Sequence, residues 1–224
     1  MPRTARASVG GVCYHVINRG NNRAEVFLKE GDYAAFFKAV GHACIEVPMP
    51  VFAYCLMPNH FHLVVRPHDD GDLSKWMHWL LNAHVRRYHK HYRGSGHIWQ
   101  GRFKAFPIQE DEHLLTVLRY VERNPLRAAL VRRAENWLWS SARVLKDAGA
   151  RPTWLTDPPV DRGDDWIERV NAALTAAELD AVRKSVIRGT HFGAARWQAA
   201  TTTRLDLDST LNPRGRPRKT PEGE

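Results

Sequence analysis

The feature that most constrains the fold is the run YCLMPNHFHLVV at residues 54–65. It is too apolar for one exposed helix, and Met57-Pro58-Asn59 places turn-forming residues at its centre, so it predicts two strands joined by a turn. Successive side chains of a strand point to opposite faces, so His60 and His62 share one face of the second strand. The histidines on that face of the predicted sheet need a polar partner, such as a hydrogen-bonding group, water or a metal ion.

The residues before these strands predict a strand and then a helix. Residues 11–28 alternate apolar and polar side chains and then reach the turn-rich run NRGNN, which indicates a strand followed by a tight loop. Residues 31–47 change to helical spacing, and Asp32 is the expected N-cap of that helix.

The residues after them predict a helix, a strand and a second helix. Residues 71–92 carry apolar side chains along one helical stripe, and a GSG loop then leads to a short strand within residues 97–108. Residues 111–131 form an amphipathic helix that must end or bend near Asn124, because Pro125 follows. The order up to about residue 147 predicts an α+β fold, with helices packed on one sheet.

The C-terminal part has a different character. Residues 148–165 are rich in Pro, Gly and Asp, which is typical of a linker or an extended arm. Two short helices are expected after it, and Thr175 and Glu178 have the spacing of a capping box. The run NPRGRPRKTPEGE at the end is expected to be disordered on its own. The predicted organisation is a core domain at residues 1–150, a helical extension at 151–211 and a basic tail at 212–224.

Charge and cysteine usage narrow the partners and the compartment. The chain has 33 Lys and Arg against 24 Asp and Glu, a formal net charge of +9, which favours a polyanionic partner such as nucleic acid. Cys13, Cys44 and Cys55 form no CxxC pair and lie in apolar contexts, as reduced thiols do. No apolar run is long enough for a membrane span or a secretion signal. We therefore expect a cytoplasmic protein without a membrane partner.

The histidine pair is a candidate metal site. Two imidazoles on one strand face can converge on one divalent cation, and Zn, Mn, Co or Mg could be held this way. The alternative is that His60 and His62 are hydrogen-bonded residues on a solvated sheet face. A histidine-triad nucleotide hydrolase would need a third histidine two residues further on, where this chain has Val64.

The helix predicted at residues 111–131 carries a candidate nucleophile. Tyr120 and Asn124 are four residues apart, so their side chains leave the same helix face. A phenol has a reference pKa of about 10, so it is a poor nucleophile at neutral pH unless nearby cations favour its ionised form. A metal ion on a scissile phosphate would supply such assistance in a phosphoryl transfer. Asn124 could complete a metal site through its amide oxygen, or cap the helix end. The arginines around the pair are Arg119, Arg123, Arg127, Arg132 and Arg133.

Three motifs, YCLMPNHFHLVV, IWQGRFK and RYVERNPLRAALV, resemble those of the single-tyrosine HUH transposases of bacteria, and they occur in the family's order. With its C-terminal extension, the chain looks most like a REP-associated tyrosine transposase, an enzyme of repetitive extragenic palindromes. The resemblance covers roughly residues 9–145 and implies a ferredoxin-like antiparallel sheet. It also implies that His60 and His62 hold Mg or Mn, with Asn124 as the third protein ligand and Tyr120 as the nucleophile.

In this reading the protein is a metal-dependent single-stranded DNA endonuclease and strand transferase. The resemblance implies a 5′-phosphotyrosine intermediate, hairpin-forming REP-type repeats as substrates, and a nucleoid-associated place in the cytoplasm. The alternative is a DNA-binding protein that recognises such hairpins without cleaving them. Short members of the family dimerise across swapped active sites, but this chain continues well beyond residue 150, so both a monomer and a dimer remain open.

Several basic segments are candidate DNA-binding surfaces. AHVRRYHKHYR interleaves cations with tyrosines that can stack on unpaired bases, although a solvated helix end explains it equally well. PRGRPRK in the tail resembles an AT-hook, which enters an A·T minor groove, although a short basic tail could also act by electrostatic attraction alone. RGTHFGAARWQ at residues 188–198 could dock against the core and read bases, or only pack. The candidate DNA-binding residues are Arg86, Arg87, Lys90, Arg93, Arg102, Lys104, Arg119, Arg123, Arg127, Arg214 and Arg216.

Overall fold

The computed structural model describes residues 8–205 and residue 207. The predicted basic tail, with Arg214 and Arg216, therefore lies outside the described residues. No helix in the described part of the chain is long and apolar enough to cross a membrane.

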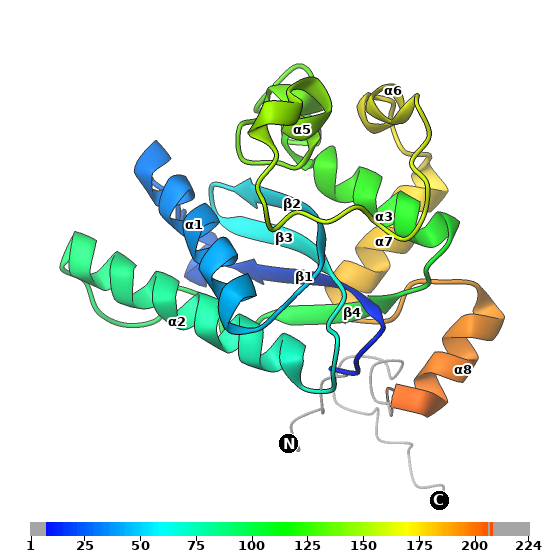
Figure 1. The fold of residues 1–224 in the computed structure, drawn as a ribbon, viewed down its shortest axis with the longest axis horizontal. Helices are drawn as coiled ribbons and strands as arrows, with labels where there is room; N and C mark the ends of the chain where they lie inside the picture. Colours follow the sequence, from blue (N-terminus) through cyan, green and yellow to red (C-terminus); the bar gives the residue numbers. More distant parts are fainter. Residues whose placement is uncertain (1–7, 206, 208–224) are drawn as a thin grey trace, which may run out of the picture.

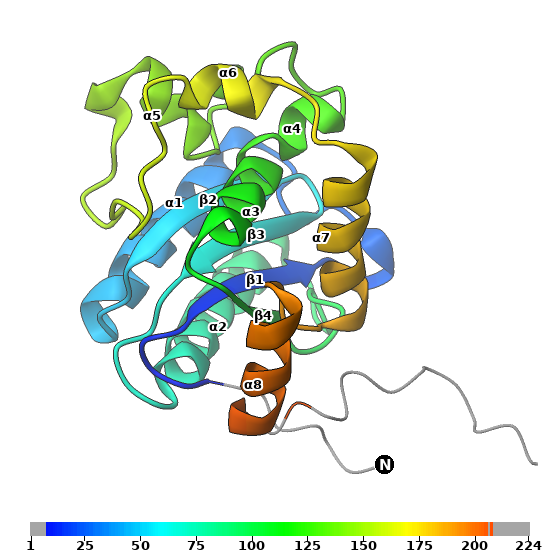
Figure 2. The same cartoon turned by 90° about the vertical axis from the view of Figure 1, so that its right-hand side faces the viewer.

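A four-stranded antiparallel sheet forms the centre of the molecule, with the strand order β2-β3-β1-β4 (Figure 1). Its strands are β1 (Cys13–Arg19), β2 (Val51–Met57), β3 (His60–Val65) and β4 (Lys104–Ile108). The helices α1 (Glu30–Glu46) and α2 (Asp72–Tyr92) pack on one face, and α3 (Glu112–Glu122) and α7 (Ala176–Arg188) lie on the other (Figure 2). The chain order β-α-β-β-α-β followed by α3 is the predicted ferredoxin-like α+β arrangement.

Strand alternation divides the interior into two cores. Tyr14, Phe61 and Leu63 point toward α1 and α2 and belong to the first core. Cys13, Ile17 and Val64 point the other way, and they pack with α3 and α7 in the second core. His62 has the same parity as Val64, so the histidine face of β3 lies beneath α3. The alternative of a solvated histidine face is wrong for His62, which is only 2% exposed.

The break at Met57-Pro58-Asn59 becomes the tight turn between β2 and β3, as predicted, and Met57 pairs directly with His60 across the ladder. The turn is held by the loop that follows β1. The amide of Gly20 donates to the Asn59 carbonyl at 2.8 Å, and the amide of Val26 donates to the Pro58 carbonyl at 2.9 Å. These bonds fix the start of β3, and with it the position of His60.

Two predicted boundaries are wrong. β4 covers only the end of the expected strand, because Gly101 has a φ of +103°, which interrupts an extended chain. α1 begins at Glu30, with Lys29 as the N-cap. Asp32 is therefore the third helical residue, and its carboxylate accepts bonds from the Leu28 and Lys29 amides at 3.0 and 3.3 Å. A carboxylate at that position reaches back to the helix start, as in a capping box.

The Pro-rich segment after residue 148 is an extended arm packed on the sheet. The Thr156 amide donates to the Val51 carbonyl at 2.8 Å, and Leu155 forms a parallel bridge with Val51. The two predicted helices follow as α6 (Trp166–Asn171) and α7, which starts at the expected Thr175 capping box. The remaining helices are α4 (Asn124–Arg127), α5 (Ala142–Lys146), α8 (Ala195–Leu205), and the 3-10 turns η1 (Asn21–Arg23), η2 (Ala134–Asn136) and η3 (Ala148–Ala150).

Candidate active site

Three imidazoles lie together on the α3 face of the sheet. His60 and His62 project from β3 with ring centroids 5.0 Å apart. His15 projects from the neighbouring strand β1, and its ring centroid is 5.0 Å from that of His62. His15 Nε2 is 2.8 Å from His62 Nδ1, within hydrogen-bond distance, and His15 is fully buried. The antiparallel register of β1 against β3 produces this contact, because it aligns Ile17 with His62.

The hydrogen bonds of His60 fix which of its ring nitrogens carries the proton. The Asn59 amide nitrogen donates to the Arg23 carbonyl at 3.0 Å, so its Oδ1 faces the imidazole. His60 Nδ1 lies 2.6 Å from that oxygen. Because a carboxamide oxygen can only accept, Nδ1–H of His60 is the donor, and Nε2 carries a lone pair. An outer hydrogen bond to Nδ1 is the arrangement that orients a metal-binding histidine.

All three imidazoles are held neutral. Burial lowers the pKa of His15 to about 3. Burial, with the positive charges of Arg19 and Arg127, lowers the pKa of His60 to about 4. Burial, together with His60 and His15, keeps the pKa of His62 well below its ordinary value. At neutral pH these rings therefore keep the lone pairs that a cation requires.

The Tyr120 side chain lies beside the imidazoles. Its ring centroid is 5.7 Å from that of His62 and 6.0 Å from that of His15. The phenol comes from the last turn of α3 and is 5% exposed. Burial raises the pKa of Tyr120, while the positive charges of Arg127, Arg183 and Arg19 act to lower it. The structure thus brings the predicted nucleophile and the predicted metal ligands into one cluster.

Arg127 and Asn124 complete this cluster from α4. The Arg127 guanidinium lies 5.5 Å from the centroid of the Tyr120 ring and donates to Asn124 Oδ1 at 2.8 Å. Asn124 is 1% exposed, and its Nδ2 atom has no hydrogen-bond partner among the described residues. The side chain does not cap the helix end, since its oxygen accepts from a side chain. The unpaired Nδ2 is a donor, so it could be satisfied by a phosphate oxygen or a water, whereas Oδ1 is the atom that could bind a cation.

The donor set fits a metal ion that also binds its substrate. In the part of the chain that the structure describes, no three His, Cys, Asp or Glu side chains, His15, His60 and His62 included, are arranged to hold one metal ion together. The available donors are the imidazoles of His60 and His62 and the amide of Asn124. A divalent cation held by two imidazoles and one amide oxygen would keep further coordination positions for water and for phosphate oxygens. The residues present therefore suit a cation shared with a phosphate.

A cationic cavity, which we name the Arg19 cavity, adjoins the cluster. Arg19 ends β1 and pairs with His60 across the ladder, so the cavity begins beside the histidines. Its volume is about 220 Å³. Arg102 and Lys104, which the sequence predicts to bind DNA, also line it and are exposed. The remaining lining residues are Ile17, Asn18, Gln100, Val186 and Ile187.

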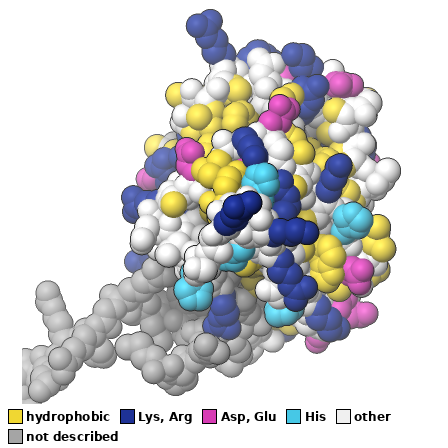
Figure 3. All heavy atoms as spheres, turned by 90° about the vertical axis from the view of Figure 1, so that its left-hand side faces the viewer, with side chains coloured by type: hydrophobic (Ala, Val, Ile, Leu, Met, Phe, Trp, Pro, Cys, Tyr) yellow, Lys and Arg dark blue, Asp and Glu magenta, His cyan; other side chains and the backbone are white. Residues whose placement is uncertain are grey.

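The other predicted DNA-binding residues on α2 have different environments. Arg86, Lys90 and Arg93 are exposed near the end of α2, where Figure 3 shows Lys, Arg and His side chains gathered on one face. Arg87 instead pairs with the buried carboxylate of Asp32, with Nη1 and Oδ1 3.1 Å apart. That ion pair ties α2 to the start of α1.

Arg119 and Arg123 hold the C-terminal extension. Arg119 Nε donates to the Arg169 carbonyl at 3.1 Å, and its Nη1 lies 3.5 Å from Glu178 Oε1. Arg123 donates to the carbonyls of Val170 and Asn171. These two arginines therefore join α3 to α6 and α7, and a DNA contact for them stays a prediction.

Sequence reasoning missed His15, Asn59 and Arg19. His15 belongs to the alternating strand CYHVINR, where its place opposite His62 depends on the strand order. Asn59 immediately precedes the histidine motif and reads as a turn residue only. Arg19 lies in the NRGNN run at the end of β1, and the sequence of that run does not indicate a nearby functional site.

Comparisons with known proteins identify the family of this chain. The family model for IS200-like transposases matches residues 8–124, a span that contains both histidines, Tyr120 and Asn124. A candidate REP-associated tyrosine transposase of Haemophilus influenzae is 31% identical over 122 residues, 49% of this chain and 69% of the relative. The REP-associated tyrosine transposase of Escherichia coli is 24% identical over 138 residues, 59% of this chain and 76% of the relative.

A solved REP-associated tyrosine transposase bound to a REP hairpin has the same fold. Its TM-score is 0.56 at 20% sequence identity, and the match covers 72% of this chain and 94% of that one. The family model alone spans more than half of the present chain. The chain therefore belongs to the IS200-like transposase family, and the relatives it matches there are REP-associated tyrosine transposases.

Proposed function

We propose that this transposase cuts and rejoins single-stranded DNA at hairpin-forming REP-type repeats, with Tyr120 as the nucleophile. The observation that carries the proposal is the position of the Tyr120 ring, 5.7 Å from that of His62 and beneath the Arg127 guanidinium. A tyrosine that served packing alone would not need three neutral imidazoles and a cation around it. Buried polar groups gathered in this way are typical of a catalytic site.

The transfer needs no external energy source. The phenolic oxygen of Tyr120 attacks the scissile phosphorus, a P–O bond to tyrosine forms, and the bond from phosphorus to the 3′ oxygen breaks. The phenolic proton passes to solvent, and the departing 3′ oxygen takes up a proton to become a hydroxyl. Another 3′ hydroxyl can reverse the reaction, because one phosphodiester-type linkage replaces another of similar energy.

Residues of the cluster and of the adjoining cavity can assist this reaction. Arg127 favours the ionised phenol, since it acts to lower the pKa of Tyr120 against the effect of burial. Arg127 is exposed, so its side chain can move aside as a phosphate enters. His60 and His62 would hold Mg or Mn with Asn124, and the bound ion would draw charge from the phosphate and stabilise the leaving 3′ oxygen. Arg19, Arg102 and Lys104 would receive the DNA backbone in the Arg19 cavity.

A covalent-adduct assay tests the proposal. The full chain is incubated with Mn²⁺ or Mg²⁺ and a single-stranded hairpin carrying a label on the 3′ side of the expected cut, and the products are separated on a denaturing gel. We expect a labelled protein band for the wild type and none for Tyr120→Phe. Tyr33→Phe is the matched control, because Tyr33 is also a buried phenol but belongs to the core on the α1 and α2 side of the sheet, so its loss should keep the band.

Two outcomes would count against the proposal. A band that persists in Tyr120→Phe would move the nucleophile to another residue. Tight hairpin binding by the wild type, with no band in either metal, would favour the alternative of a protein that recognises the hairpin without cleaving it.

A further inference from the structure

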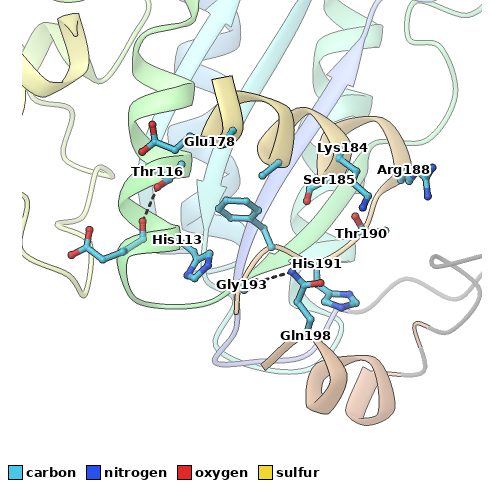
Figure 4. Close-up of a pocket in the computed structure, with 14 residues that line it drawn as sticks. His113, Thr116, Glu178, Lys184, Ser185, Arg188, Thr190, His191, Gly193 and Gln198 are labelled. Atoms are coloured by element: carbon cyan, nitrogen blue, oxygen red, sulfur yellow. Dashed lines mark hydrogen bonds between the residues drawn. The ribbon is translucent and has the colours of Figure 1, made fainter. Parts of the chain in front are cut away.

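A second cavity lies between the core and the C-terminal extension, and we name it the α7 pocket. It has a volume of about 560 Å³, within the range of ligand sites. α3 forms one wall, α7 another, and residues 190–193 the floor (Figure 4). Thr116 lines it and stands four residues before Tyr120 on α3, so the pocket begins one helical turn from the phenol.

One end of the α7 pocket is cationic. Lys184 and Arg188 lie one turn apart on α7, and Figure 4 shows them beside Ser185 and Thr190. Lys184 and Arg188 are exposed, and neither forms an ion pair within residues 8–205. Two cations next to two hydroxyl groups make a suitable environment for a phosphate group.

The other end offers an aromatic ring and a carboxylate. The His113 side chain is 31% exposed, and its Nδ1 lies 2.7 Å from Asp111 Oδ1, which holds the ring in place. The edge of Phe192 supports it, with the ring centroids 5.2 Å apart. Glu112 lines the same end and could accept bonds from the amino group of a base, whereas Glu178 beside it is held by Thr175 and Arg119.

The floor of the pocket is hydrogen-bonded to the sheet. The Phe192 amide donates to the Pro107 carbonyl and its carbonyl accepts from the Gln109 amide, both at 2.9 Å, so this segment extends the sheet beside β4. His191 is 2% exposed, and its Nδ1 has no hydrogen-bond partner in the described part of the chain. A buried ring nitrogen without a partner, in a residue that lines a cavity, is what a ligand with a donor or an acceptor would satisfy.

We propose that the α7 pocket binds one unpaired nucleotide of the DNA strand, with its phosphate at Lys184 and Arg188 and its base against His113. This inference rests on the proposed function, because the nucleotide belongs to the strand that Tyr120 cuts. The Arg19 cavity and the α7 pocket flank the same end of α7, since Val186 and Ile187 line the first and Ser185 and Arg188 line the second. A DNA strand that crosses the end of α7 would place neighbouring nucleotides in the Arg19 cavity and in the α7 pocket. The α7 pocket would then recognise the base sequence next to the cut.

Binding measurements test the phosphate end. Fluorescence anisotropy would compare a labelled hairpin that has unpaired extensions with the same hairpin without them. Tyr120→Phe is used as the background, with a chelator present, so that no cutting occurs. Adding Lys184→Gln and Arg188→Gln should weaken binding of the extended hairpin about tenfold and flatten its salt dependence, and should barely change binding of the blunt one. Lys38→Gln with Lys146→Gln removes the same charge from exposed positions outside the pocket and is the control.

A scan of the base positions tests the aromatic end. Abasic substitution along the extensions should find one position that costs about tenfold in affinity in the background protein, as expected for one stacked base. The same abasic substitution should cost little affinity when His113→Ala is also present, because the imidazole on which the base stacks is then absent. Equal urea midpoints for all variants would show that the pocket variants fold.

Four results would overturn the inference. The variant with Lys184→Gln and Arg188→Gln could weaken binding of blunt and extended hairpins equally. The control variant could weaken binding as much as that variant does. No base position could show coupling to His113. Displacement by dAMP of a labelled mononucleotide, without any coupling to a strand position, would instead identify a site for a free nucleotide and would also overturn it. All these measurements are independent of cutting, so a missing covalent adduct would leave them unchanged.

Discussion

His15 and His62 are joined imidazole to imidazole, with Nε2 of the first 2.8 Å from Nδ1 of the second and both rings buried. For His62 to present the lone pair of Nε2 to a cation, its Nδ1 must carry the ring proton, and that N–H then donates to His15 Nε2. His15 therefore orients His62 as Asn59 orients His60. His15 comes from β1 and Asn59 from the turn before β3, yet they leave the same ring nitrogen available in both histidines.

His15→Phe should weaken binding of Mn²⁺ in the absence of DNA by about 10- to 100-fold, the usual cost of losing an outer-shell partner. Calorimetry of the metal alone measures this without any cutting. His84→Phe is the matched control, because His84 is also a buried histidine and its two ring nitrogens have no partner among the described residues. It lies on α2 and packs against Phe36 of α1, on the other side of the sheet. Equal metal affinities in the two variants would contradict the role of His15.

Arg127→Gln should slow formation of the covalent adduct and move its pH dependence upward. Arg127 acts to lower the pKa of Tyr120, so its removal raises that pKa further and leaves less phenolate at any given pH. We expect the rate near neutral pH to fall about tenfold, with partial recovery as the pH is raised. Rates measured from about pH 6 to 9 would check this, and Arg132→Gln, an exposed neighbour in sequence, should leave the profile unmoved.

Asp32→Asn should lower the free energy of unfolding by about 2 to 3 kcal/mol at pH 7, because it weakens a buried cluster. The Asp32 carboxylate is fully buried, pairs with Arg87, and accepts from the Tyr92 hydroxyl at 2.6 Å. Burial alone would raise the pKa of Asp32, but the bonds from Tyr92 and Arg87 hold it below its ordinary value.

The sign of the pH dependence of this effect follows from that lowered pKa. The carboxylate contributes its full stability above the pKa of an unfolded Asp, about 4, and the contribution is lost as the pH falls through the lower folded pKa. Urea unfolding should therefore show the gap between wild type and Asp32→Asn narrowing below about pH 4. Asp157→Asn, at an exposed ion pair with Arg151, should change stability by no more than about 0.5 kcal/mol at any of these pH values.

Glu122→Gln should loosen the C-terminal extension. Glu122 is fully buried, and its two carboxylate oxygens accept from Ser141 Oγ and Trp166 Nε1, each at 2.8 Å. A glutamine has only one acceptor oxygen, so one of these donors loses its partner at a cost of about 2 kcal/mol. Hydrogen exchange of the α6 amides should speed up accordingly. An unchanged rate in α6, with Glu168→Gln as the exposed control on that helix, would argue that Glu122 does not anchor the extension.

The elements of the fold could be predicted because their signals are local. The turn at Met57-Pro58-Asn59, the alternation in β3 and the capping box at Thr175 each depend on residues within a few positions of one another. The resemblance then supplied roles for Tyr120 and Asn124, which periodicity alone left open. The sequence could not show that Arg87 pairs with Asp32, because that bond joins two helices separated by two strands.

By itself, the sequence determined the order of strands and helices, the shared face of His60 and His62, and the helix that carries Tyr120. Only the tertiary structure decided that His15 supports His62 across 47 residues of chain, that Arg19 opens a cavity beside them, and that residues 190–193 close a pocket against α3. The reason is physical. Backbone periodicity is set by neighbouring residues, whereas these contacts depend on strand register and on how whole elements pack, and many weak interactions spread along the chain decide both.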